Sequence, residues 1–570
     1  MMRLKKLRSH GKALLAQLDS DLHRPASPTP VASTGLLSSA KIRLDILLLI
    51  LLTAGIYLFF WSISDTSGND TVTRSLMAWR WLKKPFLIWA CNDITWVFGP
   101  FHCYLNVIAI LLTGNPLWGP RLASGLFGAM TAIPLYLIVS HYFGRRAAFY
   151  SGLAFPFFTF FIGLSVSGNS EPISSFFILW AIYFAIRFRE NEFLSHIIAS
   201  GLLFSLAAAT RYDVWIFGPV LFIYLLWIYY RNRSRVVLKG LIFFALIAAS
   251  FPVAWIIGNY HLVGDPLIFL KQAYDPLPFS GHFDIRLAKH ILYDFALFPS
   301  ALMFGLTPAV FLIAIFGFYR TLKEKRRPDR FPAIILLVLI FWYMSFFVIG
   351  QKMIAVSRMM VNHGLFLLIF FGPGMTALLS ILKPARQKIL LVSTFLMAVL
   401  FAILPPFSVL RPAALNSRLI PLSQYVPAPP EIKSTGNLLH RQLESGKKIM
   451  LDCKDMAQRS IMLRLFEHEN GIIQFYGTPS EFIPDIKIEK PDIIVLSRSN
   501  RHLNEIQASW ITTSELQFAD INYVLDRTIG NFLIFSRKAS DGRGSVFPIT
   551  NWRSSQYGKF RALSATKFEL

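Results

Sequence analysis

Long apolar segments recur along most of this chain, and they constrain its fold more than any other feature of the sequence. A transmembrane α-helix needs about 20 consecutive apolar residues, because each residue adds about 1.5 Å and the hydrocarbon core is about 30 Å thick. By this criterion the chain is an α-helical polytopic membrane protein with about eleven membrane-spanning helices. The expected spans are residues 44–63, 121–141, 147–163, 173–187, 193–210, 214–230, 239–258, 297–318, 331–349, 361–381 and 388–405.

The composition agrees with a chain whose main solvent is lipid. Charged residues make up 16% of the chain, against about 25% in soluble proteins. A net charge of +25 would suggest nucleic-acid binding in a soluble protein. Here the basic residues stand between apolar segments, as in cytoplasmic loops beside anionic lipids, so we expect the lipid bilayer as a partner and no nucleic acid. The three cysteines are too few and too scattered for a disulfide framework or a zinc site.

One short apolar segment, residues 100–113, decides the orientation of the spans. Its length reaches only about 21 Å, and Pro and Gly lie at its two ends, so it is ambiguous as a span. If it lies along the membrane, the basic clusters of the later loops fall on the side of the N-terminal tail; if it crosses, they all move outside. The positive-inside rule favours the first arrangement. We therefore predict a juxtamembrane helix here.

Three regions follow from this topology. Residues 1–43 form a cytoplasmic basic tail and linker, which either lies on the inner leaflet as an amphipathic helix or is disordered. Residues 44–405 form the transmembrane domain, with a large outer loop over 64–99. Residues 406–570 lie outside the cytoplasm, because the number of spans is odd.

The C-terminal region has the pattern of a small soluble α/β domain. A predicted helix over 456–467 stands among short apolar segments that predict strands, and such alternation is typical of a parallel sheet. We expect no phosphate-binding loop, no catalytic triad and no metal cluster in it, and we interpret it as a structural or substrate-orienting module. The predicted strands are 448–452, 471–475, 492–496 and 532–535.

In this topology nearly all the membrane-adjacent acidic residues, together with several arginines, fall on the outer face. A transporter would instead carry ionisable groups near the middle of the membrane and show Gly/Pro-broken helices in repeated halves. Ionisable side chains at one face therefore favour chemistry at the membrane boundary. A polytopic transporter or flippase of a lipid-linked or small solute is the alternative.

Short motifs at the outer ends of the spans resemble those of the GT-C superfamily of polytopic glycosyltransferases, which includes the protein O-mannosyltransferases and the lipid A aminoarabinose transferase. The resemblance covers about residues 44–405 and departs from the family in the first loop, where the two acids, Asp65 and Asp70, are not contiguous. The motifs are Ser67-Gly68-Asn69-Asp70, Pro100-Phe101-His102, Arg121, Tyr142-Phe143-Gly144-Arg145-Arg146, Ser170-Glu171-Pro172, Thr210-Arg211-Tyr212-Asp213, Asn259-Tyr260, Gly264-Asp265-Pro266 and Ser357-Arg358.

The resemblance implies a GT-C-like enzyme that transfers a sugar from a polyprenyl-phosphate donor to a glycan, glycolipid or protein acceptor at the outer face. Asp70 is expected to be the general base, because a carboxylate at a low-dielectric boundary can have its pKa raised toward the working pH. Arginine suits phosphate contacts. The donor phosphate is assigned to Arg358, Arg211, Arg121 and Lys352, and substrate or metal contacts to Glu171, Asp65 and His102.

Each assignment has a structural alternative. Asp70 can be a solvated loop residue, the arginines can extend to the membrane interface without binding a ligand, and Glu171 can lie in a helix first turn capped by Ser170. The requirement for a cofactor stays open, with a divalent metal ion as the candidate. The expected location is a bacterial inner membrane, with the active site and the C-terminal domain facing the periplasm.

Overall fold

The structure is a computed structural model and falls into two compact units, Met1–Pro430 and Glu431–Leu570. The domain boundary predicted at residues 405 and 406 lies outside the described residues, as does the tail before residue 40. The residues described are 40–63, 69–91, 98–273, 285–324, 330–349, 357–403, 430–453, 455–475, 479–498, 514–518 and 521–538.

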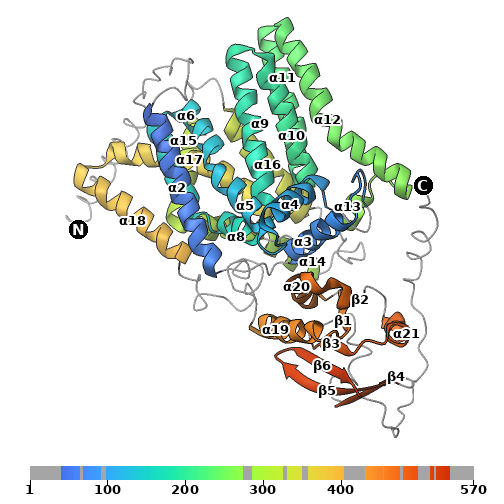
Figure 1. The fold of residues 1–570 in the computed structure, drawn as a ribbon. Helices are drawn as coiled ribbons and strands as arrows, with labels where there is room; N and C mark the ends of the chain where they lie inside the picture. The colour runs from blue at the N-terminus through green and yellow to red at the C-terminus, as the bar shows by residue number, and fades with distance from the viewer. Residues whose placement is uncertain are drawn as a thin grey trace. The chain divides into compact units, whose positions relative to one another are not determined.

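The first unit is built of helices (Figure 1). Its first half contains α2 (Ala40–Ile63), α3 (Asn69–Lys83), α4 (Pro100–Thr113), α5 (Gly119–Met130), α6 (Ala132–Phe143), α7 (Arg145–Ala154), η2 (Phe155–Phe157), α8 (Thr159–Ser167), α9 (Glu171–Asn191), α10 (Leu194–Thr210), η3 (Tyr212–Ile216), α11 (Phe217–Asn232) and α12 (Arg235–Val263). Its second half contains α13 (Ile268–Ala273), α14 (Ile285–Leu306), α15 (Pro308–Lys323), α16 (Phe331–Tyr343), η4 (Met344–Ile349), η5 (Ser357–Met360), α17 (Val361–Ile381) and α18 (Pro384–Ile403).

The predicted fold class is confirmed: the chain is a helical multi-pass membrane protein with a small C-terminal sheet. Among the described residues, eight helices are long and apolar enough to cross a membrane, or up to ten if each bent pair counts as one span. All eleven predicted spans coincide with helical segments. Eleven spans were predicted, and this number is larger than the number of long apolar helices because α10 is only 17 residues long and two predicted spans are bent.

The two bends have local causes. The predicted span 147–163 bends by 58° between η2 and α8, where Phe158 has an extended backbone. The predicted span 297–318 bends by 111° between α14 and α15. At that break Thr307 has a left-handed φ of 74° and Pro308 begins the next helix, a combination that ends a helix and starts another. A periodicity of apolar residues alone does not reveal such breaks.

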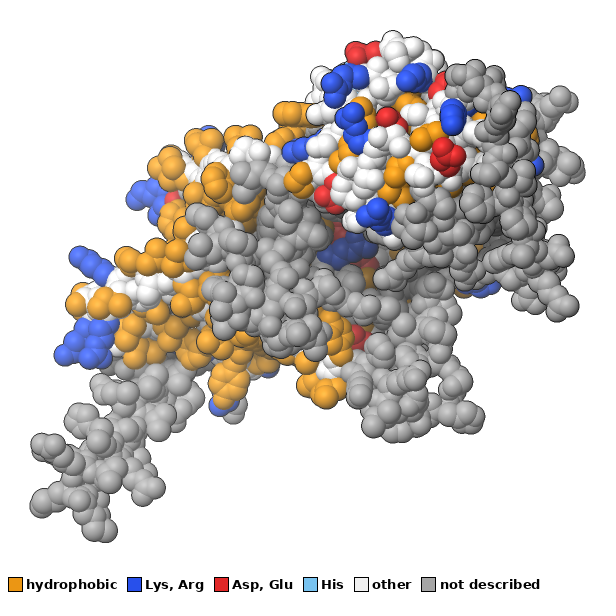
Figure 2. Space-filling view, turned by 90° about the horizontal axis from the view of Figure 1, so that it is seen from below, with side chains coloured by type: hydrophobic (Ala, Val, Ile, Leu, Met, Phe, Trp, Pro, Cys, Tyr) orange, Lys and Arg blue, Asp and Glu red, His pale blue; other side chains and the backbone are white. Residues whose placement is uncertain are grey.

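The surface of the helical unit is that of a membrane protein. Figure 2 shows broad areas of hydrophobic side chains with Lys and Arg gathered in a few places. Many large apolar residues are exposed on α2, α12 and α18, including Leu48, Leu246 and Leu400. An exposed apolar area of this extent is what lipid tails cover.

The helical core is closely packed where α15 and α17 meet. A Cβ atom on Gly317 would lie 2.0 Å from the carbonyl oxygen of Phe370, and one on Gly374 would lie 2.3 Å from that of Ile313. Small residues at such a crossing let two helix backbones approach closely, which is a common way of packing helices in membranes.

Enlarging Gly317 therefore tests this packing. Gly317→Val is expected to lower the thermal unfolding temperature in detergent, at a cost of about 1–3 kcal/mol or more, because the two backbones must separate. The matched control is Gly55→Val in α2, where a Cβ meets nothing within 4 Å. Equal unfolding temperatures for the two variants would contradict the close crossing.

Ionisable side chains gather at the two opposite ends of the helical unit. α9 has 21 residues and is therefore about 30 Å long, with Glu171 at its first residue and Glu190 near its last. At the Glu190 end, the Glu190 carboxylate lies 3.3 Å from His141 Nδ1. Asp45 accepts a bidentate pair of 2.7 Å hydrogen bonds from Arg145 and a further one from Tyr136. The Glu171 end holds the candidate site.

The described residues of the second unit include a six-stranded sheet with the order β2-β1-β3-β6-β5-β4. β1 pairs in parallel with β2 and β3, so the parallel sheet predicted there is present, but β6 pairs with β3 in the antiparallel sense. β4 and β5 were not predicted; β5 and β6 form a hairpin closed by the two residues Gly530-Asn531, a strong turn signal. The elements are α19 (Pro430–Glu444), β1 (Ile449–Asp452), α20 (Met456–Arg464), η8 (Phe466–Gly471), β2 (Ile472–Phe475), α21 (Pro479–Glu489), β3 (Ile493–Ser497), β4 (Glu515–Phe518), β5 (Ile521–Ile529) and β6 (Phe532–Arg537).

Candidate active site

The short helices α3 and α4 pack against each other and carry the first part of the site (Figure 1). Asp70 lies in the first turn of α3, and Arg74 follows it by four residues, so both side chains share one helix face. Arg74 is buried; its Nη1 lies 3.4 Å from His102 Nδ1 on α4, and its guanidinium lies 4.1 Å from the centre of the Phe98 ring. Neither contact carries a negative charge, so the charge of Arg74 is balanced by the nearby carboxylates of Asp70 and Glu171.

The turn before α9 carries the second part. Gly168, at a φ of 87°, ends α8, and Pro172 stands in the first turn of α9, so the chain reverses just before Glu171. Arg211, directly after α10, reaches this turn: its Nη1 lies 2.8 Å from Glu171 Oε1 and donates to Ser170 Oγ at 3.2 Å. The guanidinium also pairs with Asp213, at 2.8 Å from Nε to Oδ1.

Arg358 joins the two parts. Its Nη1 donates a hydrogen bond to Asp70 Oδ2, across 288 residues of sequence. Both side chains keep some exposure, 30% for Arg358 and 24% for Asp70. The charges of Arg74, Arg211 and Arg358 all act on Asp70, which shows that these groups form one cluster. We call Asp70, Arg74, Glu171, Arg211, Asp213 and Arg358 the charged cluster.

The pKa of Asp70 differs from the sequence-based expectation. Burial alone raises the pKa of this carboxyl, but the charges of Arg358 and Arg74 and the hydrogen bond from Arg358 outweigh burial, so the pKa is lowered. The expectation of a raised pKa was wrong because it considered the low dielectric without the ion pair. Burial lowers the pKa of Arg74 to about 10, whereas Asp213 and Glu171 overcome burial at Arg211 and raise its pKa.

Several buried polar atoms of the site have no hydrogen-bond partner among the described residues. They include both carboxylate oxygens of Glu171, whose contact with Arg211 is an ion pair without hydrogen-bond alignment, and Nε2 of His102. Buried polar groups in native proteins nearly always have partners, so a group left without one calls for a ligand or water. On α3 and α4 the remaining such atoms are Arg74 Nε, Thr71 Oγ1, Ser75 Oγ and both amide atoms of Asn106.

Arg121, a further predicted residue, is held by backbone carbonyls. Arg121 donates from Nε to the carbonyl of Val166 at 2.7 Å and from Nη2 to that of Trp61 at 2.8 Å. It thereby ties the ends of α2 and α8 together, and its role in binding phosphate stays a prediction. Asp65 and Lys352 lie outside the described residues.

Arg74 and Asp213 are the members of the cluster to which the sequence-based prediction assigned no role, and Arg74 is the one that stood in none of the recognised motifs. A signal existed, because Arg74 follows Asp70 by four residues in an amphipathic segment, the spacing of neighbours on a helix face. Without the position of α4 and Arg358, nothing distinguished it from the basic residues later in α3.

Comparison with known proteins agrees with this architecture. A family model described as dolichyl-phosphate-mannose-protein mannosyltransferase matches residues 98–255, which include α4, Glu171 and Arg211. No curated protein sequence matches the chain. Among solved structures, ArnT from Cupriavidus metallidurans bound to undecaprenyl phosphate superposes with a TM-score of 0.58 at 13% identity, over 88% of this chain and 99% of ArnT.

The chain has the GT-C fold. The apo structure of the same ArnT gives the same TM-score at 14% identity, over 87% of this chain and 98% of ArnT. A more distant likeness, to the oligosaccharyltransferase AglB from Archaeoglobus fulgidus, has a TM-score of 0.48 at 12% identity and covers 82% of this chain and 71% of AglB. The resemblance to the GT-C superfamily that was predicted from short motifs is thus confirmed at the level of the fold.

Proposed function

We propose that this GT-C protein is a glycosyltransferase that moves a sugar from a polyprenyl-phosphate donor to an acceptor hydroxyl at the non-cytoplasmic face of the membrane. The observation that carries the proposal is the charged cluster itself. Asp70, Glu171, Arg211 and Arg358 come from distant parts of the sequence and meet at one end of the helical unit. A carboxylate beside several arginines suits a reaction that takes up a proton and releases a phosphate.

The transfer is a substitution at the anomeric carbon of the sugar. The acceptor oxygen forms a bond to this carbon as Asp70 takes the hydroxyl proton. The bond from the carbon to the phosphate oxygen breaks, and its electron pair leaves with polyprenyl phosphate. Arg358 and Arg211 bind the phosphate, whose negative charge grows as this bond breaks. Glu171, with both oxygens lacking a hydrogen-bond donor among the described residues, accepts hydrogen bonds from the sugar.

Charge balance in the cluster suggests how the donor activates Asp70. Within the charged cluster three arginines face three carboxylates, so no positive charge is in excess for an incoming phosphate. Arg358 is the arginine that can exchange its carboxylate partner for the donor phosphate, because its side chain is 30% exposed whereas that of Arg211 is 15% exposed. When the phosphate binds Arg358, Asp70 loses its hydrogen bond and gains a nearby negative charge. Both changes raise its pKa, which makes it a better base.

The pH dependence of the rate tests this exchange of partners. The profile of kcat/KM reports the free enzyme and that of kcat reports the donor complex. In the free protein the pKa of Asp70 lies below its ordinary value, so Asp70 stays deprotonated into the acidic range. Since donor binding raises this pKa, the fall of kcat on the acidic side is expected at higher pH than the fall of kcat/KM. Coincident acid limbs would mean that Arg358 keeps Asp70 as its partner throughout the reaction.

A reconstituted system separates this proposal from a transporter or flippase. Purified protein in proteoliposomes is supplied with labelled polyprenyl-phosphate sugars and candidate glycan, glycolipid and protein acceptors. We expect release of polyprenyl phosphate and transfer of the labelled sugar to the acceptor. In the cell, the proposed site and the C-terminal unit face the periplasm of a bacterial inner membrane. Flux of a solute or of the lipid-linked sugar, without turnover of any carrier, would instead favour transport.

A further inference from the structure

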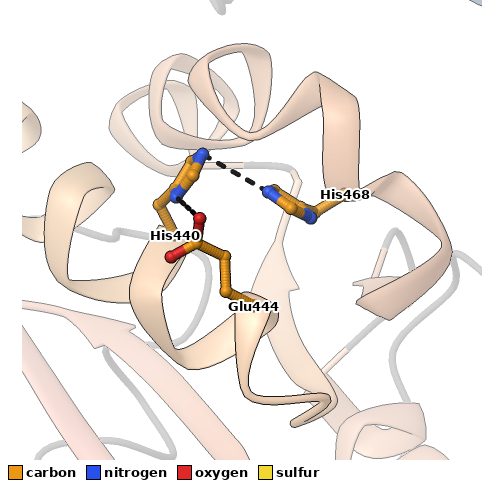
Figure 3. Close-up of side chains that lie close together, drawn as sticks. All are labelled: His440, Glu444 and His468. Atoms are coloured by element: carbon orange, nitrogen blue, oxygen red, sulfur yellow. Dashed lines mark hydrogen bonds and ion pairs between the residues drawn. The ribbon is translucent and has the colours of Figure 1, made fainter.

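A second group of chemically active side chains lies in the C-terminal unit, where the sequence-based prediction expected no metal cluster. His440 and Glu444 stand on α19, and His468 stands in η8 (Figure 3). One ligand atom from each residue lies within 4.8 Å of the other two. The sequence did not indicate this group because His468 follows His440 by 28 residues and only the fold brings them together.

The backbone explains why these three side chains meet. His440 and Glu444 are four residues apart, so they project from the same face of α19. The end of η8 approaches this helix closely, because a Cβ atom on Gly471 would lie only 2.7 Å from Leu443 Cδ2. η8 thus faces α19 with His468 opposite His440.

The distances suit one metal ion. Nε2 of His440 lies 3.3 Å from Nε2 of His468, and one carboxylate oxygen of Glu444 completes a set of three ligand atoms that all lie within 4.8 Å of one another. Two ligands at about 2.1 Å from a tetrahedral Zn²⁺ are themselves separated by about 3.4 Å. Without a metal, the two imidazoles, which meet at 90°, share one N–H···N hydrogen bond.

We propose that His440, Glu444 and His468 form a binding site for a divalent transition-metal ion of the Zn²⁺ class. Two imidazoles and one carboxylate are a common protein ligand set for zinc, and they leave the fourth position open to water or to a further ligand. Glu444 is more than half exposed, at 56%, and His440 is 38% exposed, so an ion can reach the group from solvent. Glu444 Oε1 faces Nδ1 of His440 at 3.6 Å, so its side chain must change rotamer to direct an oxygen at an ion held between the two Nε2 atoms, a change open to an exposed carboxylate.

Zinc titration of the full-length protein tests the proposal. The protein is purified in detergent, its affinity tag is removed, and bound metal is stripped with a chelator. Zn²⁺ is then added in competition with a coloured chelator. We expect one tightly bound Zn²⁺ per chain in the wild type, and binding weakened by about tenfold or more in His440→Ala and in His468→Gln. Co²⁺ in place of Zn²⁺ is expected to give the intense visible absorption of a four-coordinate site.

The matched control is His261→Ala, an exposed histidine at the end of α12 in the other unit, which is expected to bind like the wild type. Circular dichroism and size-exclusion chromatography establish that each variant is folded. A wild type that binds no Zn²⁺ in competition with the chelator would overturn the proposal. So would retention of the full affinity by folded His440→Ala and His468→Gln proteins.

Discussion

Replacing Asp70 by Asn is expected to slow sugar transfer by about 10²–10⁴-fold, the usual contribution of a positioned general base. Asn has nearly the same shape as Asp but cannot take up the acceptor proton. The change also releases Arg358 from its ion pair, so this arginine becomes available to the donor phosphate. Binding of the donor should therefore be unchanged or tighter, while kcat falls. A purely structural role for Asp70 would weaken both.

The experiment measures kcat and KM for the donor in proteoliposomes, together with direct binding of a polyprenyl phosphate. Asp265→Asn is the matched control, because Asp265 lies in a turn beyond α12 and pairs with exposed Lys271 at 2.6 Å. We expect wild-type rates from this control. Near-wild-type kcat in Asp70→Asn would remove Asp70 from the role of base, whatever the effect on KM.

The positions of the spans could be predicted because the thickness of the bilayer sets the length of each apolar run, and this length is visible in the sequence. The breaks at Phe158 and Thr307 could not, since they depend on local backbone angles rather than on hydrophobicity. In the C-terminal unit β4 and β5 were missed for another reason: β4 has only four residues, and burial stops alternating in the exposed second half of β5.

In the candidate site, too, the sequence indicated one part of the arrangement and left another part hidden. The sequence could indicate that Asp70, Glu171, Arg211 and Arg358 belong to one side of the membrane, because charges at span ends sort by side. It could not indicate that Arg358 pairs with Asp70, and this pairing determines the direction of the Asp70 pKa shift. The proposed catalytic roles of these residues rest on that pairing.

Arg211→Gln is expected to produce the largest loss of stability among single changes in the charged cluster. Arg211 is 15% exposed and contacts both Glu171, which is 5% exposed, and Asp213. Removing one partner of a buried ion pair leaves an uncompensated charge, at a cost of about 3–5 kcal/mol. We expect a marked fall in the unfolding temperature, measured by intrinsic fluorescence in detergent. We also expect loss of sugar transfer.

A double variant separates lost pairing from general damage. In Arg211→Gln with Glu171→Gln, the carboxylate that Arg211 left unpaired is neutral, so part of the lost stability should return, with a coupling of about 0.5–3 kcal/mol. Arg146→Gln, an exposed arginine of α7, is the control and should unfold like the wild type. If the two single changes in the ion pair simply add, Arg211 and Glu171 are not coupled. Recovery of stability without recovery of sugar transfer is the expected outcome, because the phosphate still lacks Arg211 and the sugar still lacks the Glu171 carboxylate.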